Sequence, residues 1–128
     1  MNTPQSRPST DGSRRVLVID DDPTILQLVQ TLLAEEGYTV DTALDGQQAL
    51  DSAAPRPEVV VLDMYLPGIS GASLADKLRA KHGQDVRIVV MSASSVAEEA
   101  GLLGAAAYIA KPFDLDELSA AVRRVLAG

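Results

Sequence analysis

The amino-acid sequence predicts an α/β fold in which helices cover both faces of a five-stranded parallel sheet. Short aliphatic runs alternate with longer helical patterns five times along the chain. The runs at 16–19, 59–62 and 88–91 are apolar at every position, as in strands that are buried on both faces. Strands that alternate with helices form parallel sheets, because each helix carries the chain back across the sheet.

The first strand, 16–19, is followed by a helix with clear signals at both ends. Asp22 is expected to cap the helix, with Pro23 at its first position, and Gly37 is expected to end it. Apolar residues at helical spacing predict the stripe that faces the core: Ile25, Leu28, Val29, Leu32 and Leu33. A weak second strand at 39–42 and a short helix near 47–53 are expected to follow.

The third strand, 59–62, follows a break at Pro55 and Pro57. A loop is expected at 66–68. The helix after this loop carries Leu74 and Leu78, which are four residues apart and therefore lie on the same side of the helix.

The remaining elements are a fourth strand at 88–91, a short Ala-rich helix at 96–103, a fifth strand at 107–109 and a last helix. The last helix is expected to begin near Asp114, because Asp114 and Glu117 have the spacing of a capping box. Its apolar side is formed by Leu115, Leu118, Val122 and Val125.

Composition narrows the class of protein further. Residues 1–13 are polar and rich in Ser, Thr and Pro, so we expect a disordered tail before a single domain at 14–128. The net charge of −7 argues against sequence-independent nucleic-acid binding and against an anionic membrane surface. The chain contains no cysteine and no apolar run long enough to span a bilayer, and we expect a cytoplasmic protein.

Chemically active side chains follow the strands of the predicted sheet. Asp20 and Asp21 come after the first strand, Asp63 after the third, Ser92 after the fourth and Lys111 after the fifth. Function in open parallel sheets gathers beyond the carboxyl ends of the strands. Neighbouring carboxylates repel one another, and one lysine is too little to balance three of them. A hard divalent cation such as Mg²⁺, which prefers oxygen ligands, would complete such a site.

This set of residues suggests phosphoryl transfer. Asp63 could attack a phosphorus atom, since aspartyl phosphates are known covalent intermediates. The cation would neutralise charge on the transferring group. Lys111 would pair with one phosphoryl oxygen, and Ser92 would donate a hydrogen bond to another.

Four segments of the chain, each beside the end of a predicted strand, resemble the receiver domains of two-component response regulators. They are VLVIDDDP at 16–23, VVLDMYLPG at 60–68, MSA at 91–93 and YIAKPF at 108–113. The resemblance covers about 14–126, and four motifs in this order are far more specific than any one alone. It implies a flavodoxin-like (CheY-like) fold with strand order 2-1-3-4-5.

The resemblance also implies a role for each matching residue. Asp63 would be the phosphoacceptor, Ser92 and Lys111 would bind the phosphoryl group, and Ser92 with Tyr108 would form the switch. Asp21, Asp63 and the backbone carbonyl of Tyr65 would bind Mg²⁺ directly and Asp20 through water, with Mn²⁺ as an alternative cation. The Lys111–Pro112 peptide bond would be cis.

The chain departs from the family pattern in two places. The interval from Ser92 to Lys111 is about one helical turn shorter than usual, so the helix at 96–103 is expected to be short or reshaped. Tyr65, two residues after Asp63, borders the expected path of attacking water and would slow hydrolysis of the aspartyl phosphate. Ser94 is a second candidate for tuning that lifetime, and an N-cap role for it is equally open.

The resemblance implies a sensor histidine kinase or a phosphotransfer protein as phosphoryl donor. Output would pass through the face formed by the helix at 96–103, the fifth strand and the last helix, which is also open to homodimer formation. No DNA-binding segment follows residue 128, so we expect a stand-alone receiver or one cut from a longer regulator.

Other functions and simpler roles remain open at this stage. A phosphatase with an aspartate nucleophile would need an acid at position 65, where the chain has tyrosine, and a flavin carrier would need a phosphate-binding loop after the first strand. Ser92 could only begin a helix, and Tyr108 could only pack. His82 is expected to be exposed and without a role in phosphate relay.

Overall fold

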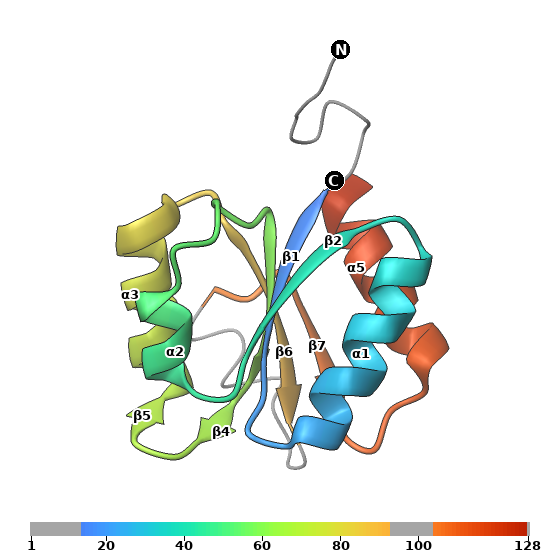
Figure 1. Cartoon of the computed structure of the whole chain (residues 1–128), viewed down its shortest axis with the longest axis horizontal. Helices are drawn as coiled ribbons and strands as arrows, with labels where there is room; N and C mark the ends of the chain where they lie inside the picture. The colour runs from blue at the N-terminus through green and yellow to red at the C-terminus, as the bar shows by residue number, and fades with distance from the viewer. Residues whose placement is uncertain (1–13, 93–103, 128) are drawn as a thin grey trace.

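The computed structural model describes residues 14–92 and 104–127 and contains the predicted parallel sheet (Figure 1). Five parallel strands lie in the order β2-β1-β3-β6-β7, which is the predicted order with the labels of Figure 1. The strands are β1 (Arg15–Ile19), β2 (Thr39–Ala43), β3 (Val59–Asp63), β6 (Arg87–Ser92) and β7 (Ala107–Ala110). Each of them contains the run that the sequence predicted as a strand.

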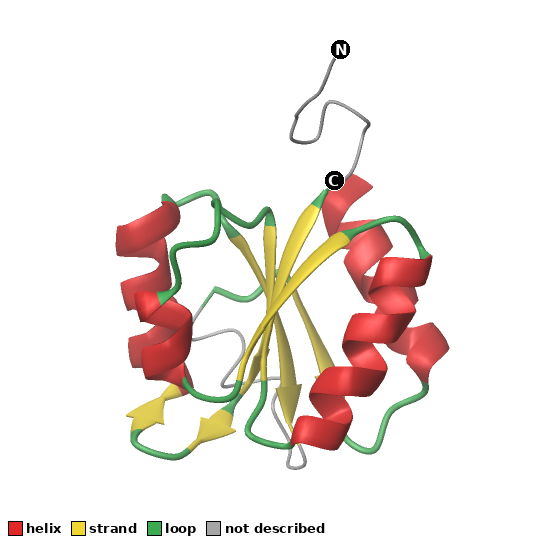
Figure 2. Cartoon of the chain, viewed as in Figure 1, coloured by secondary structure: helices red, strands yellow, loops and turns green. Residues whose placement is uncertain are grey.

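Helices cover both faces of the sheet, as Figure 2 shows. In the described part of the chain they are α1 (Pro23–Glu35), α2 (Gly46–Asp51), α3 (Gly71–His82) and α5 (Leu115–Ala127). One face carries α2 and α3 and the other carries α1 and α5. The tail at 1–13, the helix expected at 96–103 and Ser94 lie outside the described residues.

Each face of the sheet has its own apolar core, and the strand period of two divides the side chains between them. On β3, Val60 and Leu62 pack on the side of α2 and α3, while Val59 and Val61 pack on the side of α1 and α5. All four side chains are fully buried. This explains why the central strands are apolar at every position.

The ends of α1 follow the predicted signals. The Asp22 side chain accepts hydrogen bonds from the backbone N–H groups of Thr24 and Ile25 at the start of the helix. Gly37 adopts a φ of +99°, and the following N–H of Tyr38 returns to the carbonyl of Leu33. A left-handed residue with this return bond is a common way to end a helix.

The predicted apolar stripe of α1 is wrong in one respect. Leu26, which the stripe omitted, is buried at 7% exposure, whereas Leu28 is 49% exposed. Leu26, Val29 and Leu33 form the buried row of this helix. Apolar residues occupy six positions between 25 and 33, so the sequence does not fix which side of the helix faces the sheet.

The loop predicted at 66–68 is instead the centre of a two-stranded antiparallel hairpin. The hairpin consists of β4 (Tyr65–Leu66) and β5 (Ile69–Ser70). Pro67 and Gly68 form its turn, and the φ of +85° at Gly68 is one that glycine adopts without strain. The hairpin therefore joins the end of β3 directly to α3.

The starts of α2 and α5 lie close to the positions that the sequence predicted. The predicted helix near 47–53 is α2 at Gly46–Asp51, capped by the Asp45 side chain, which accepts a hydrogen bond from the Gln48 N–H. The capping box at the start of α5 is present in part, since the Asp114 N–H donates to the Glu117 carboxylate at 3.1 Å.

The two leucines of α1 provide a direct test of its orientation. Leu26→Ala should lower the free energy of unfolding by about 2–4 kcal/mol, because it removes a buried side chain. Leu28→Ala on the same helix should lower it by less than about 1 kcal/mol, because that side chain is half exposed. Urea unfolding measures both values, and equal losses for the two variants would contradict the described packing.

Candidate functional site

The candidate site lies where four neighbouring strands end at the same edge of the sheet. Asp20 directly follows β1, Asp63 is the last residue of β3, Ser92 is the last residue of β6, and Lys111 directly follows β7. The strands are parallel and adjacent in the order β1-β3-β6-β7, so their carboxyl ends meet at one edge. The topology thus brings together residues that are up to 91 positions apart in the chain.

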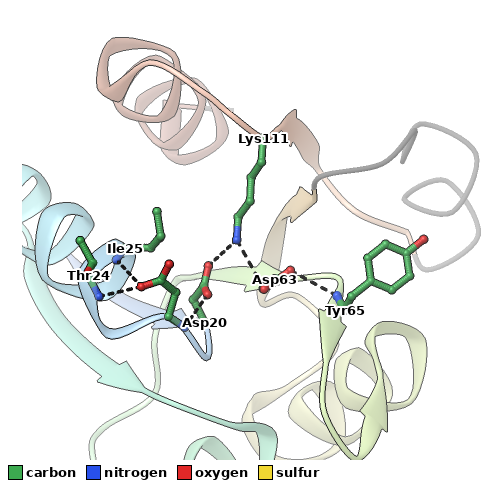
Figure 3. Close-up of polar contacts among 7 residues, drawn as sticks. Asp20, Thr24, Ile25, Asp63, Tyr65 and Lys111 are labelled. Atoms are coloured by element: carbon green, nitrogen blue, oxygen red, sulfur yellow. Dashed lines mark hydrogen bonds and ion pairs between the residues drawn. The ribbon is translucent and has the colours of Figure 1, made fainter.

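Three carboxylates meet at this edge, and one ammonium group lies between two of them (Figure 3). Asp20, Asp21 and Asp63 each offer a carboxylate oxygen, and these oxygens lie within 4.8 Å of one another. Lys111 Nζ is 2.7 Å from Asp20 Oδ2 and 3.4 Å from Asp63 Oδ2. Asp20 is fully buried and Asp63 nearly so, while Asp21 is exposed.

Backbone hydrogen bonds fix the orientation of the two buried carboxylates. Asp20 Oδ1 accepts from the Asp22 N–H at 2.9 Å, and Asp63 Oδ1 accepts from the Tyr65 N–H at 3.2 Å. In both residues the other oxygen is left to face Lys111. The Lys111 N–H in turn donates to the carbonyl of Ser92 at 2.6 Å, which ties β7 to the end of β6.

Burial and charge shift the proton affinities of the two central groups. Burial raises the pKa of Asp63, and the Asp20 carboxylate adds to the rise, while the Tyr65 N–H and Lys111 reduce it without cancelling it. Burial lowers the pKa of Lys111, but the hydrogen bond and charge of Asp20, helped by Asp63, outweigh it and raise the pKa. The ammonium therefore stays charged, and an ionised Asp63 is short of counter-charge.

The donor set fits a divalent cation. All three side chains offer carboxylate oxygens, which are the ligands that hard cations such as Mg²⁺ prefer. Three negative charges face a single ammonium group, so a cation among them would correct the imbalance. The described residues thus have the chemistry of an oxygen-ligand metal site.

The other predicted site residues lie around this cluster. Ser92 is fully buried at the end of β6, and the Lys111–Pro112 peptide bond is cis. Tyr65 and Tyr108 are 55% and 52% exposed. Figure 3 shows the Tyr65 ring directed away from the Asp63–Lys111 pair, although its N–H contacts Asp63.

The exposure expected from the sequence is wrong for Leu115, which was placed on the apolar side of the last helix but is 38% exposed, and for His82. His82 is partly buried at the end of α3, and Arg56 donates a hydrogen bond to its carbonyl. Burial lowers the pKa of His82, and the charges of Lys81 and Arg56 lower it further. His82 is the last residue of α3, whereas the carboxylate cluster lies at the edge of the sheet where that helix begins, so His82 is not part of the site.

Sequence reasoning missed Gly71, the first residue of α3, which the hairpin brings against Met64. Met64 lies between Asp63 and Tyr65 in the chain. The available signal was a glycine between the loop predicted at 66–68 and the helix that carries Leu74, where close backbone approach is a standard reason for glycine.

The parallel sheet with an acidic site at its carboxyl edge defines a class of α/β protein. Comparison with known families identifies that class. Residues 16–123 match the response regulator receiver domain family. The chain therefore belongs to this family, the signalling domain of two-component systems, and the family resemblance of its sequence is confirmed.

Individual relatives agree with this assignment. The response regulator MprA of Mycolicibacterium vanbaalenii is 43% identical over 116 residues, which cover 88% of this chain and 50% of that protein. The chain spans about half the length of the curated relatives it matches.

No helix in the described part of the chain has the length and hydropathy needed to cross a membrane.

Solved structures share the fold. Chemotaxis protein CheY4 of Vibrio cholerae has a TM-score of 0.81 at 29% identity, and the match covers 88% of this chain and 98% of that chain. The response regulator TrrA of Thermotoga maritima, solved in complex with Mg²⁺-BeF, has a TM-score of 0.77 at 37% identity, with coverage of 88% and 98%. The predicted CheY-like fold is therefore confirmed.

Proposed function

We propose that Asp63 accepts a phosphoryl group in a reaction that depends on a divalent cation, Mg²⁺ or alternatively Mn²⁺. The convergence of three carboxylates, two of which contact one partly buried ammonium, carries this proposal. Asp21, Asp63 and the Tyr65 carbonyl would hold the cation directly, and Asp20 would hold it through water. The complex of TrrA with Mg²⁺-BeF supports the same chemistry in a relative.

In the transfer step a carboxylate oxygen of Asp63 forms a bond to phosphorus. The bond that breaks joins phosphorus to the donor, a histidine nitrogen in the case of a sensor kinase or phosphotransfer protein. A cation held by these residues would supply positive charge that offsets the negative charge on the oxygens of the transferring group. The domain provides this chemistry itself, and water would later hydrolyse the aspartyl phosphate.

Lys111 and Ser92 would bind the phosphoryl group after transfer. Lys111 already contacts Asp63 and stays protonated, so its ammonium can pair with a phosphoryl oxygen without a change of charge. Ser92 ends the strand beside Asp63, since Asp63 pairs with Met91 in the register of β3 and β6. Its hydroxyl would donate to a second phosphoryl oxygen.

Signal output would run from Ser92 to Tyr108 on the edge strand β7. Tyr108 is half exposed, and we propose that it turns inward when Ser92 engages the phosphoryl group. The surface around β7 and α5 would then bind a downstream protein or a second copy of the chain. The proposal includes a cytoplasmic location, beside the kinase, and no direct contact with nucleic acid by this chain.

Mass spectrometry of the intact chain tests the phosphoacceptor directly. With acetyl phosphate and Mg²⁺, the wild type should gain the mass of one phosphoryl group, and chelation of the cation should prevent the gain. Asp63→Asn should gain none, because an amide is a poor nucleophile. The exposed Asp51→Asn variant, on α2, should behave as the wild type.

Absence of any adduct in the folded wild-type chain at saturating Mg²⁺ would overturn the proposal. An adduct that persists in Asp63→Asn would move the phosphoacceptor to another residue.

Tyr65 gives a prediction about the lifetime of the phosphorylated state. We propose that its ring, although directed away from the Asp63–Lys111 pair in Figure 3, limits the approach of water from solvent to the aspartyl phosphate, so Tyr65→Asn should speed dephosphorylation severalfold. Tyr65→Phe should keep the slow rate, because it retains the ring and removes only the hydroxyl. Decay of the phosphorylated mass over time measures both rates, and an unchanged rate in Tyr65→Asn would remove this role. We propose Ser94 as a second residue that tunes the lifetime of the aspartyl phosphate.

A further inference from the structure

The hairpin β4–β5 carries a proposed cation ligand, and the first residues of two helices hold it in place. Tyr65 pairs with Ser70 across the hairpin, and Ser70 caps α3 through a hydrogen bond that its side chain accepts from the Ser73 N–H. Figure 1 shows the hairpin beside the ends of α2 and α3. The position of the Tyr65 carbonyl therefore depends on how the hairpin packs on these helices.

Gly71, at the start of α3, allows the backbone of Met64 to approach closely. A Cβ atom at position 71 would overlap the Met64 sulfur, and it would lie 3.2 Å from the Met64 carbonyl oxygen and 3.6 Å from its Cα. Side-chain rotation could relieve the sulfur contact, but it cannot relieve the tight contact with the Met64 carbonyl oxygen, whereas the distance to Cα is an ordinary van der Waals contact.

Met64 has little freedom to move elsewhere. Its N–H donates to the Met91 carbonyl of β6 at 2.8 Å, and it is 5% exposed in the core on the side of α2 and α3. It also lies between the Asp63 carboxylate and the Tyr65 carbonyl in the chain, so a displaced Met64 backbone would change the separation of these two groups.

Gly46, at the start of α2, makes a similar but softer contact with the other strand of the hairpin. A Cβ atom at position 46 would lie 2.8 Å from the Cγ2 atom of Ile69, which is the end of a side chain. Ile69 pairs with Leu66, the residue after Tyr65.

We propose that Gly71 is a positioning residue that sets the affinity of the cation site, with Gly46 in a weaker supporting role. The absence of a side chain at position 71 lets Met64 lie flush against α3, which fixes the Tyr65 carbonyl relative to Asp63. This inference rests on the proposed cation site. It assigns part of that site's affinity to packing behind the ligands.

Titration of the full chain with MgCl₂, followed by amide NMR shifts, measures the cation affinity without any phosphoryl transfer. Gly71→Ala should raise the dissociation constant for Mg²⁺ about tenfold, the usual scale for loss of support behind a metal ligand. Gly46→Ala should raise it by a smaller factor, because Ile69 can rotate away.

Gly37→Ala is the matched control for general destabilisation. Gly37 has a φ of +99° and open space around it, and it ends α1 away from the hairpin. This variant should lower the melting temperature through backbone strain and leave the Mg²⁺ affinity unchanged. If Gly71 had only a structural role, Gly71→Ala would follow this control: its melting temperature would change, and its Mg²⁺ affinity would not.

An unchanged Mg²⁺ affinity in folded Gly71→Ala, with normal binding by the wild type, would overturn the inference and leave the proposed function intact. If Gly71→Ala does not fold, Gly46→Ala decides, and an affinity equal to the wild type would overturn it. Wild-type protein that does not bind Mg²⁺ would instead contradict the proposed cation site itself.

Discussion

Three carboxylates and one ammonium lie together at the carboxyl edge of the sheet, and this imbalance of charge determines what the domain can do. Lys111 contacts Asp20 and Asp63 together, but it cannot neutralise both and Asp21 as well. The remaining negative charge favours a divalent cation, and the cation in turn would allow an anionic phosphoryl donor to approach Asp63. A carboxylate cluster whose charge was already balanced would attract neither the cation nor the phosphoryl donor.

The rest of the fold holds the charged groups where they would otherwise repel one another. Burial of a carboxylate is costly unless hydrogen bonds and opposite charge offset it. Asp20 and Asp63 therefore each use one oxygen for a backbone N–H and the other for Lys111. The apolar strands that precede them pack on both faces of the sheet, and this packing supplies the stability that the site itself lacks.

Much of this arrangement could be predicted from the sequence because it follows from short-range rules. Apolar runs identified the strands, and parallel topology then placed Asp20, Asp63, Ser92 and Lys111 at one edge. Side-chain direction on α1 could not be predicted in the same way, because apolar residues cover most of that helix and only the packed structure selects Leu26.

The hairpin and the contact of Gly71 with Met64 also could not be predicted from the pattern of the sequence. Both depend on how the loop after β3 folds against α2 and α3, and these contacts have no periodic pattern along the chain.

Because burial raises the pKa of Asp63, ionisation of this carboxyl costs free energy until a divalent cation binds beside it. Carbon NMR of the aspartate carboxyl groups across pH measures this directly. Without Mg²⁺, the pKa of Asp63 should lie above its ordinary value, so its ionisation should cost stability as pH rises through that pKa. Saturating Mg²⁺ should move the pKa of Asp63 below its value without the cation, while the signal of the exposed Asp51 should not respond to Mg²⁺. A pKa of Asp63 at its ordinary value without Mg²⁺, or one that does not fall when Mg²⁺ is added, would contradict the account.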